Sequence, residues 1–110
     1  MRPIRVTVSA QEASNPIPMD HYREPFNVSI GVAVTGTLQY TVEHTFDDVF
    51  ADGYDASTGV WFANDAAALV NATTSQDGNL AFPVTAIRLN VTSYTSGSAT
   101  MTLIQAGGGN

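Results

Sequence analysis

The stretch Phe82-Pro-Val-Thr-Ala-Ile-Arg-Leu-Asn-Val-Thr-Ser-Tyr-Thr-Ser-Gly-Ser-Ala-Thr-Met-Thr-Leu-Ile-Gln-Ala106 indicates the fold class of this chain. Apolar residues alternate with polar ones from Ile87 to Val91, and again from Ala99 to Leu103. The sequence Ser96-Gly97-Ser98 separates the two runs. Strict alternation puts all apolar side chains of a strand on one face, so this stretch predicts a hairpin with one apolar and one polar face.

The same pattern recurs through the rest of the chain. Alternating runs cover 4–10, 28–34 and 38–46, and Thr35-Gly36 predicts a tight turn between the last two, which makes a second hairpin. The small residues on the polar side of 27–33 indicate that something packs closely on that side. Two prolines, Pro16 and Pro18, exclude a central strand there and predict an edge or an extended crossing.

Shorter segments connect these runs. Residues 60–62 predict a short buried strand, and 64–70 is the one stretch with helical propensity, enough for a single turn. Residues 11–15, 47–58 and 71–79 are expected to be polar turns or loops, the last of them turning at Asp77-Gly78. Six to eight short strands with frequent turns predict an all-β chain: an antiparallel sandwich, jelly-roll-like, forming a single domain over 1–110. Its N-terminal segment is expected to be extended, and residues 107–110 form a glycine-rich tail.

Composition restricts the function. The chain has no cysteine, which excludes disulfides and thiolate metal sites within these 110 residues, and it shows no signal peptide and no long apolar run. Ten acidic residues against four basic ones give a net charge of -6, which disfavours nucleic acid as a partner. Only 13% of the residues are charged, against roughly 25% in typical soluble domains. A surface so poor in charge is expected to be partly covered by other subunits.

All four basic residues are arginines, whose planar guanidinium groups suit protein interfaces. We therefore expect partner contacts along the N-terminal segment, the proline crossing, the polar face of the C-terminal hairpin and the tail. The candidate partner-binding residues are Arg2, Arg5, Pro16, Pro18, Arg23, Arg88, Asn90, Thr92 and Gly107.

Three groups of residues are candidate chemical sites. The acidic segment Asp47–Asp55 lacks the ligand spacing of an EF-hand, so a solvated loop is favoured over a calcium site. His44 lies on the apolar face of its run, with no nucleophile motif beside it, and is expected to be a partly buried histidine rather than a base. Glu43 with Asp47 or Asp48 would make a glycosidase pair only across a deep cleft. We therefore expect no enzymatic activity, no cofactor and no bound metal.

Trp61 and Tyr54 leave another function open. Together they would form an aromatic platform for a sugar, although a lone tryptophan in a sandwich belongs more often to the core. The alternative function is therefore a carbohydrate- or receptor-binding module.

Three stretches carry a resemblance to a known family. Pro16-Ile-Pro-Met-Asp-His-Tyr-Arg-Glu-Pro-Phe-Asn-Val28, Tyr40-Thr-Val-Glu-His-Thr-Phe-Asp-Asp48 and Phe82 to Gly107 resemble small structural proteins of tailed bacteriophages, including capsid decoration, or cement, proteins. The resemblance covers most of the chain but rests on strand and turn patterns, so it transfers no functional residue. It implies a virion protein, made in the bacterial cytoplasm, that binds the major capsid protein on the capsid surface and forms a homodimer or homotrimer there. Under the alternative function, the same resemblance implies a tail or fibre module.

Overall fold

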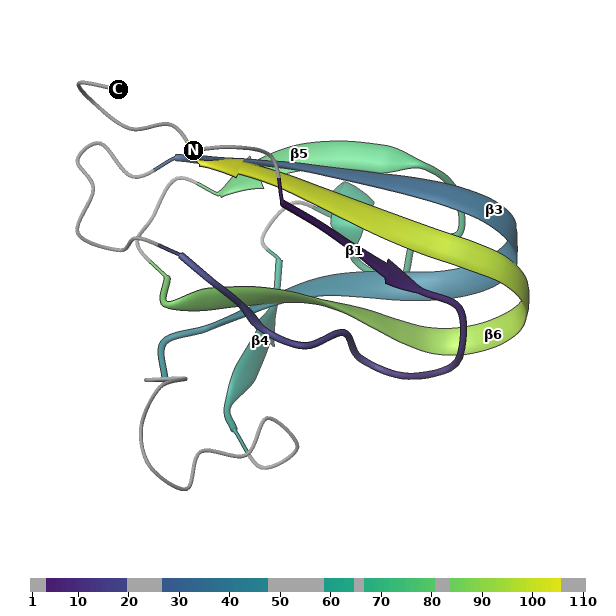
Figure 1. Cartoon of the computed structure of the whole chain (residues 1–110), viewed down its shortest axis with the longest axis horizontal. Helices are drawn as coiled ribbons and strands as arrows, with labels where there is room; N and C mark the ends of the chain where they lie inside the picture. The colour runs from purple at the N-terminus through teal and green to yellow at the C-terminus, as the bar shows by residue number, and fades with distance from the viewer. Residues whose placement is uncertain (1–3, 20–26, 48–58, 65–66, 81–83, 106–110) are drawn as a thin grey trace.

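The chain folds into one antiparallel β-sheet, seen in a computed structural model (Figure 1). The structure describes residues 4–19, 27–47, 59–64, 67–80 and 84–105. Its elements are β1 (Ile4–Val8), β2 (Ile17–Pro18), β3 (Val28–Thr45), β4 (Trp61–Ala63), a 3-10 turn η1 (Ala67–Leu69), β5 (Gln76–Leu80) and β6 (Ala86–Gln105). The all-β, antiparallel prediction is confirmed. Among the described residues, no helix is long and apolar enough to cross a membrane.

The centre of the sheet is a pair of long strands rather than two hairpins. β3 and β6 run antiparallel over their whole length, from Val28 opposite Gln105 to Thr45 opposite Ala86. The predicted turns at Thr35-Gly36 and Ser96-Gly97-Ser98 are therefore wrong, because each lies inside a continuous strand. The alternating runs are correct as strands, but the partner of each is in the other half of the chain.

A crease bends this two-stranded ribbon at its middle. Gly36 lies opposite Gly97, and both have positive backbone angles, with φ of 80° and 83°. A left-handed conformation is open to glycine at little cost, and the register slips at Thr37/Leu38 and Gln39/Tyr40 add further twist. Figure 1 shows both long strands curving back on themselves, so that the two halves of the ribbon face each other.

Short strands widen each half of the ribbon. β1 pairs with the C-terminal half of β6, and β5 pairs with the N-terminal half of β3. In the other half β2 pairs with β6 and β4 pairs with β3. The strand order is compatible with the jelly-roll expectation, but both layers belong to one continuous sheet and not to the two separate sheets of a sandwich.

The apolar faces of the two halves form the core between them. Fully buried side chains from one half, such as Ile30 and Leu103, belong to the same cluster as Val42 and Leu89 from the other. Tyr40 is also fully buried, and its hydroxyl donates to the carbonyl oxygen of Thr74 at 2.8 Å.

Two of the expected polar loops are partly strand or strand-like. Asp77-Gly78 is not a turn, since both residues lie inside β5 and pair with β3. Residues 11–15 run beside β6, where the backbone amide of Ser14 donates to Leu89 at 2.7 Å and that of Val91 donates to Glu12 at 3.0 Å. The edge position predicted for the proline segment is confirmed by β2, and the single helical turn by η1.

Candidate interaction surfaces

An exposed apolar patch, which we call the aromatic end, lies at the C-terminal end of β3 and beside β4. It consists of Phe46, Val60 and Phe62, which are 53%, 57% and 46% exposed. Phe62 lies opposite His44 on neighbouring strands and therefore shares the apolar face of β3. The prediction that 60–62 is a strand is confirmed, whereas its burial is wrong, because this end of the apolar face remains open to solvent.

His44 forms the floor of the aromatic end. Its side chain is 5% exposed, and its ring centroid lies 5.5 Å from that of Phe46 and 5.9 Å from that of Phe62. The two phenylalanine rings are themselves 5.6 Å apart. Aromatic contacts at these distances stabilise a fixed arrangement, so the patch is a shaped surface rather than a set of loose side chains. The sequence prediction of a buried histidine on the apolar face is confirmed.

Hydrogen bonds fix the strand ends that carry the aromatic end. The hydroxyl of Thr45 donates to the carbonyl oxygen of Val60 at 2.7 Å, and the backbone amide of Val60 donates to Oδ2 of Asp47 at 2.8 Å. The Asp47 carboxylate is therefore a structural acceptor. The rest of the predicted acidic segment lies outside the described residues. Among the residues that the structure describes, no group of three or more acidic or histidine side chains could hold a metal ion.

A polar cluster lies on the opposite face of β3, β4 and the neighbouring strand β6. Nε of Arg88 donates to Oε1 of Glu43 at 2.8 Å, and Nδ2 of Asn90 donates to Oε2 of Glu43 at 3.4 Å. The Arg88 guanidinium also lies 4.2 Å from the centroid of the Trp61 ring. The side chains of Arg88 and Glu43 are only 14% and 18% exposed. Two candidate contact residues, Arg88 and Asn90, are thus engaged within the chain.

Removal of Glu43 tests this cluster. Glu43→Ala leaves a largely buried guanidinium without its carboxylate, so we expect the free energy of unfolding to fall by about 1 to 3 kcal/mol. The measurement is urea denaturation, with Glu12→Ala as the control because Glu12 is exposed. Equal losses in the two variants would contradict a structural role for the Glu43 carboxylate.

The polar cluster affects two hypotheses from the sequence, the aromatic sugar platform and the glycosidase pair. The Arg88 side chain covers one face of the Trp61 ring, so that face is closed to a stacked sugar. Tyr54, the second residue of the proposed sugar platform, lies outside the described residues, as does Asp48. The carboxylate of Glu43, considered for a glycosidase pair, is held by Arg88 and Asn90.

The remaining candidate contact residues are scattered. Arg5 is exposed on β1, where its Nε donates to Oγ1 of Thr102 at 3.3 Å. Thr92 is exposed, and its hydroxyl donates to the carbonyl oxygen of Gln39 at 3.4 Å. Pro18 is exposed at an edge of the sheet and Pro16 is partly buried. Arg2, Arg23 and Gly107 lie outside the described residues. The contact role of all these residues stays a prediction.

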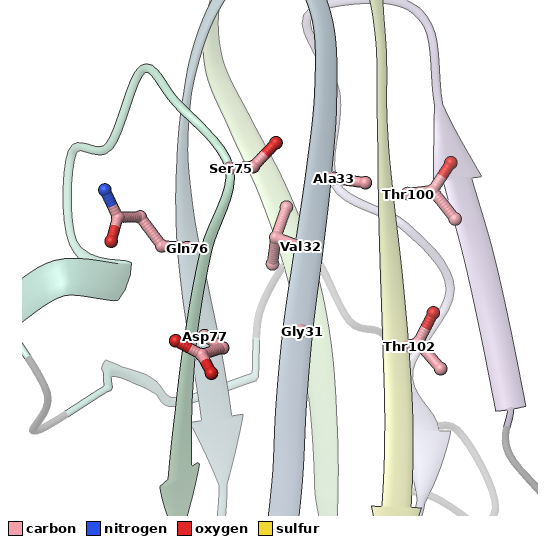
Figure 2. Close-up of a pocket in the computed structure, with 8 residues that line it drawn as sticks. All are labelled: Gly31, Val32, Ala33, Ser75, Gln76, Asp77, Thr100 and Thr102. Carbon is pink, nitrogen blue, oxygen red and sulfur yellow. The ribbon is translucent and has the colours of Figure 1, made fainter.

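A shallow hollow of about 440 Å³ lies over the outer face of β3 (Figure 2). Gly31 and Ala33 form its floor, and the side chains of Thr100 and Thr102 border it from β6, with Asp77 on the side of β5. A Cβ atom added at Gly31 would meet nothing within 4 Å. The sequence indicated that something packs on these small residues, and no described residue of the chain does so.

Sequence reasoning missed two features of these surfaces. The partnership of Glu43 with Arg88 depends on pairing between strands 45 residues apart, which local alternation does not specify. The exposure of Phe46 and Phe62 was missed because alternation assigns a face to a residue but does not show where the covering layer ends. One available signal was the position of Phe46, immediately before an acidic segment.

Comparisons with known proteins do not assign the chain to a family. No protein-family model matches it, and no curated protein matches it. A solved structure, described as Bacillus endospore appendages that form a novel family of disulfide-linked pili, is similar over 93% of this chain and 82% of its own length. The sequence identity is 16% and the TM-score is 0.47. At this level of similarity the match carries no inference about the role of the present chain.

Proposed function

We propose that this chain is a structural virion protein, which binds the outside of a phage capsid and cements neighbouring major capsid subunits. The observation that carries the proposal is the aromatic end, where Phe46 and Phe62 present about half of their surface to solvent. Exposed apolar patches bordered by polar surface mark sites of protein association. The sequence resemblance to phage decoration proteins supplies the type of partner.

The shape of the patch suits a fixed protein surface. The rings of Phe46 and Phe62 contact that of buried His44, and hydrogen bonds hold the strand ends beneath them, which lowers the entropy cost of binding. Aromatic side chains of this kind commonly form the energetic centre of an interface. A cement protein needs such an anchor and a polar surface around it, and the low charge of the chain matches this requirement.

The proposal includes the partners and the setting predicted from the sequence. The major capsid protein is the partner of the aromatic end, and copies of the chain associate with one another on the capsid surface of the virion. Exposed Arg5, Pro18 and Thr92 are available as peripheral contacts in this arrangement.

Capsid binding by a Phe62→Ser variant tests the proposal. Phe62 is 46% exposed, so the substitution removes patch area without opening the core, and we expect capsid affinity to fall by about tenfold or more, as for an interface hot spot. The measurement is co-sedimentation with purified capsids that lack the protein, over a range of protein concentrations.

Ile104→Ser is the matched control. Ile104 is 44% exposed, but it lies opposite Ser29 on the outer face of the other half of the ribbon. We expect this variant to bind capsids as the wild type does. Unchanged binding by Phe62→Ser, or an equal loss in both variants, would argue against the aromatic end as the capsid contact.

A further inference from the structure

Among the residues that the structure describes, no second strand pairs with the outer edge of β1. β1 stands at the end of the strand order β1-β6-β3-β4 and runs next to β6 (Figure 1), and within the described residues it pairs with β6 alone. The sequence Ile-Arg-Val-Thr-Val has high strand propensity and contains neither glycine nor proline. Such an edge offers a row of backbone donors and acceptors to another strand.

The other three flanking strands are protected or too short. β2 has two residues and contains Pro18, and β4 has three residues. β5 is as long as β1 but contains Asp77 and Gly78, which weaken strand pairing. Of the four flanking strands, β1 is therefore the one best suited to accept a partner.

The apolar side of β1 is also incompletely covered. Ile4 and Val6 are only partly buried, although their neighbours on β6, Leu103 and Met101, are fully buried. A hollow of about 380 Å³ separates Val6–Val8 from residues 12–15 of the same chain. A strand added beside β1 would bury more of Ile4 and Val6.

We propose that the occupant is β1 of a second copy, paired antiparallel about a two-fold axis through Val6. In an antiparallel pair, opposite residues share a face, so this register places Val6 against Val6, Ile4 against Val8 and Arg5 against Thr7. All five residues of β1 are then paired and no like charges face each other. A two-fold axis through Arg5 would instead bring the two guanidinium groups together, and an axis through Thr7 would leave Ile4 and Arg5 without a partner inside the strand. This dimer rests on the proposed function only for its setting on a capsid.

A charge exchange at position 7 tests this register in the full chain without capsids. Thr7→Glu places two carboxylates opposite the two Arg5 side chains of the dimer, and Thr7→Arg places two further guanidinium groups there. Cross-strand charge pairs of this kind are expected to lower the dissociation constant by about three- to tenfold in the first variant and to raise it by a similar factor in the second. Sedimentation equilibrium over a wide concentration range measures both constants.

Both variants lose the same hydrogen bond, between the hydroxyls of Thr7 and Thr100 at 3.0 Å, so this loss cancels between them. Ser93→Glu and Ser93→Arg are the controls for net charge, because Ser93 is exposed on the other half of the ribbon, and we expect no opposite shifts from them. A chain that stays monomeric in the wild type and in Thr7→Glu, or Thr7 variants that shift in the same direction, would overturn the proposed dimer. Neither result would affect the capsid-binding test of Phe62.

Discussion

Gly97→Ala is expected to destabilise the folded chain by at least about 3 kcal/mol, because it adds a side chain where β6 lies tightly against the paired strand β3 at the crease. A Cβ atom at Gly97 would lie only 1.8 Å from the carbonyl oxygen of Thr35 and 2.5 Å from its carbonyl carbon. Both atoms belong to the backbone of the partner strand, so no side-chain rotation relieves the contact. The φ of 83° adds the cost of holding an L-residue in a left-handed conformation.

Gly31→Ala is the control for this prediction. Gly31 lies in β3, the other long strand, but no atom would lie within 4 Å of its added Cβ and its φ is not positive. The substitution reduces the entropy of the unfolded chain, so the expected effect lies between no change and a gain of about 1 kcal/mol. Urea denaturation of both variants gives the difference in free energy of unfolding. Similar stabilities for the two variants would contradict a strained, glycine-dependent crease.

The crease glycines, Gly36 and Gly97, show which part of the fold the sequence did not predict, namely the pairing of the strands. Alternation correctly identified the strands around residues 30, 42, 89 and 101, because the faces of a strand are a local property. Pairing is not local: a glycine between two alternating runs is read as a hairpin turn, whereas here each glycine bends a strand that pairs with a distant one. Two centrally placed glycines, one in each long run, were consistent with a crease but do not distinguish it from two hairpins.

In the candidate surfaces, too, local features were predicted from the sequence and features that depend on strand pairing were not. The buried state of His44 was predicted correctly, because it depends on the face of its own strand. The open position of Phe46 and the ion pair between Arg88 and Glu43 depend on which strands lie beside β3 and how far they extend. Interaction surfaces are made by such neighbours, so they were the less predictable part of this molecule.

Tyr40→Ala is expected to destabilise the chain by about 3 to 5 kcal/mol, since it opens a cavity between the two halves of the ribbon. Tyr40 is fully buried, and its backbone exchanges two hydrogen bonds with Ala72, at 2.9 and 2.8 Å. Tyr40→Phe keeps the ring and loses only the bond from the hydroxyl to Thr74, so a loss of about 1 kcal/mol is expected. Urea denaturation at about pH 8 separates the two effects, because every tyrosine is then neutral.

Alkaline pH gives Tyr40→Phe a second, independent readout. Burial raises the pKa of Tyr40 above its ordinary value of 10.0, because the phenolate is poorly solvated between the layers. As the pH rises past that value, the unfolded chain loses this proton before the folded chain does, so the wild type loses stability that is fully present at lower pH. Tyr40→Phe has no such proton, and its deficit relative to the wild type should therefore shrink between about pH 8 and about pH 11. Tyr94→Phe is the matched control, because the Tyr94 hydroxyl also donates to a carbonyl, that of Gly97 at 2.9 Å, but from a partly exposed position. A deficit for Tyr40→Phe that stays constant with pH would show that the Tyr40 hydroxyl is as well solvated in the folded chain as in the unfolded one.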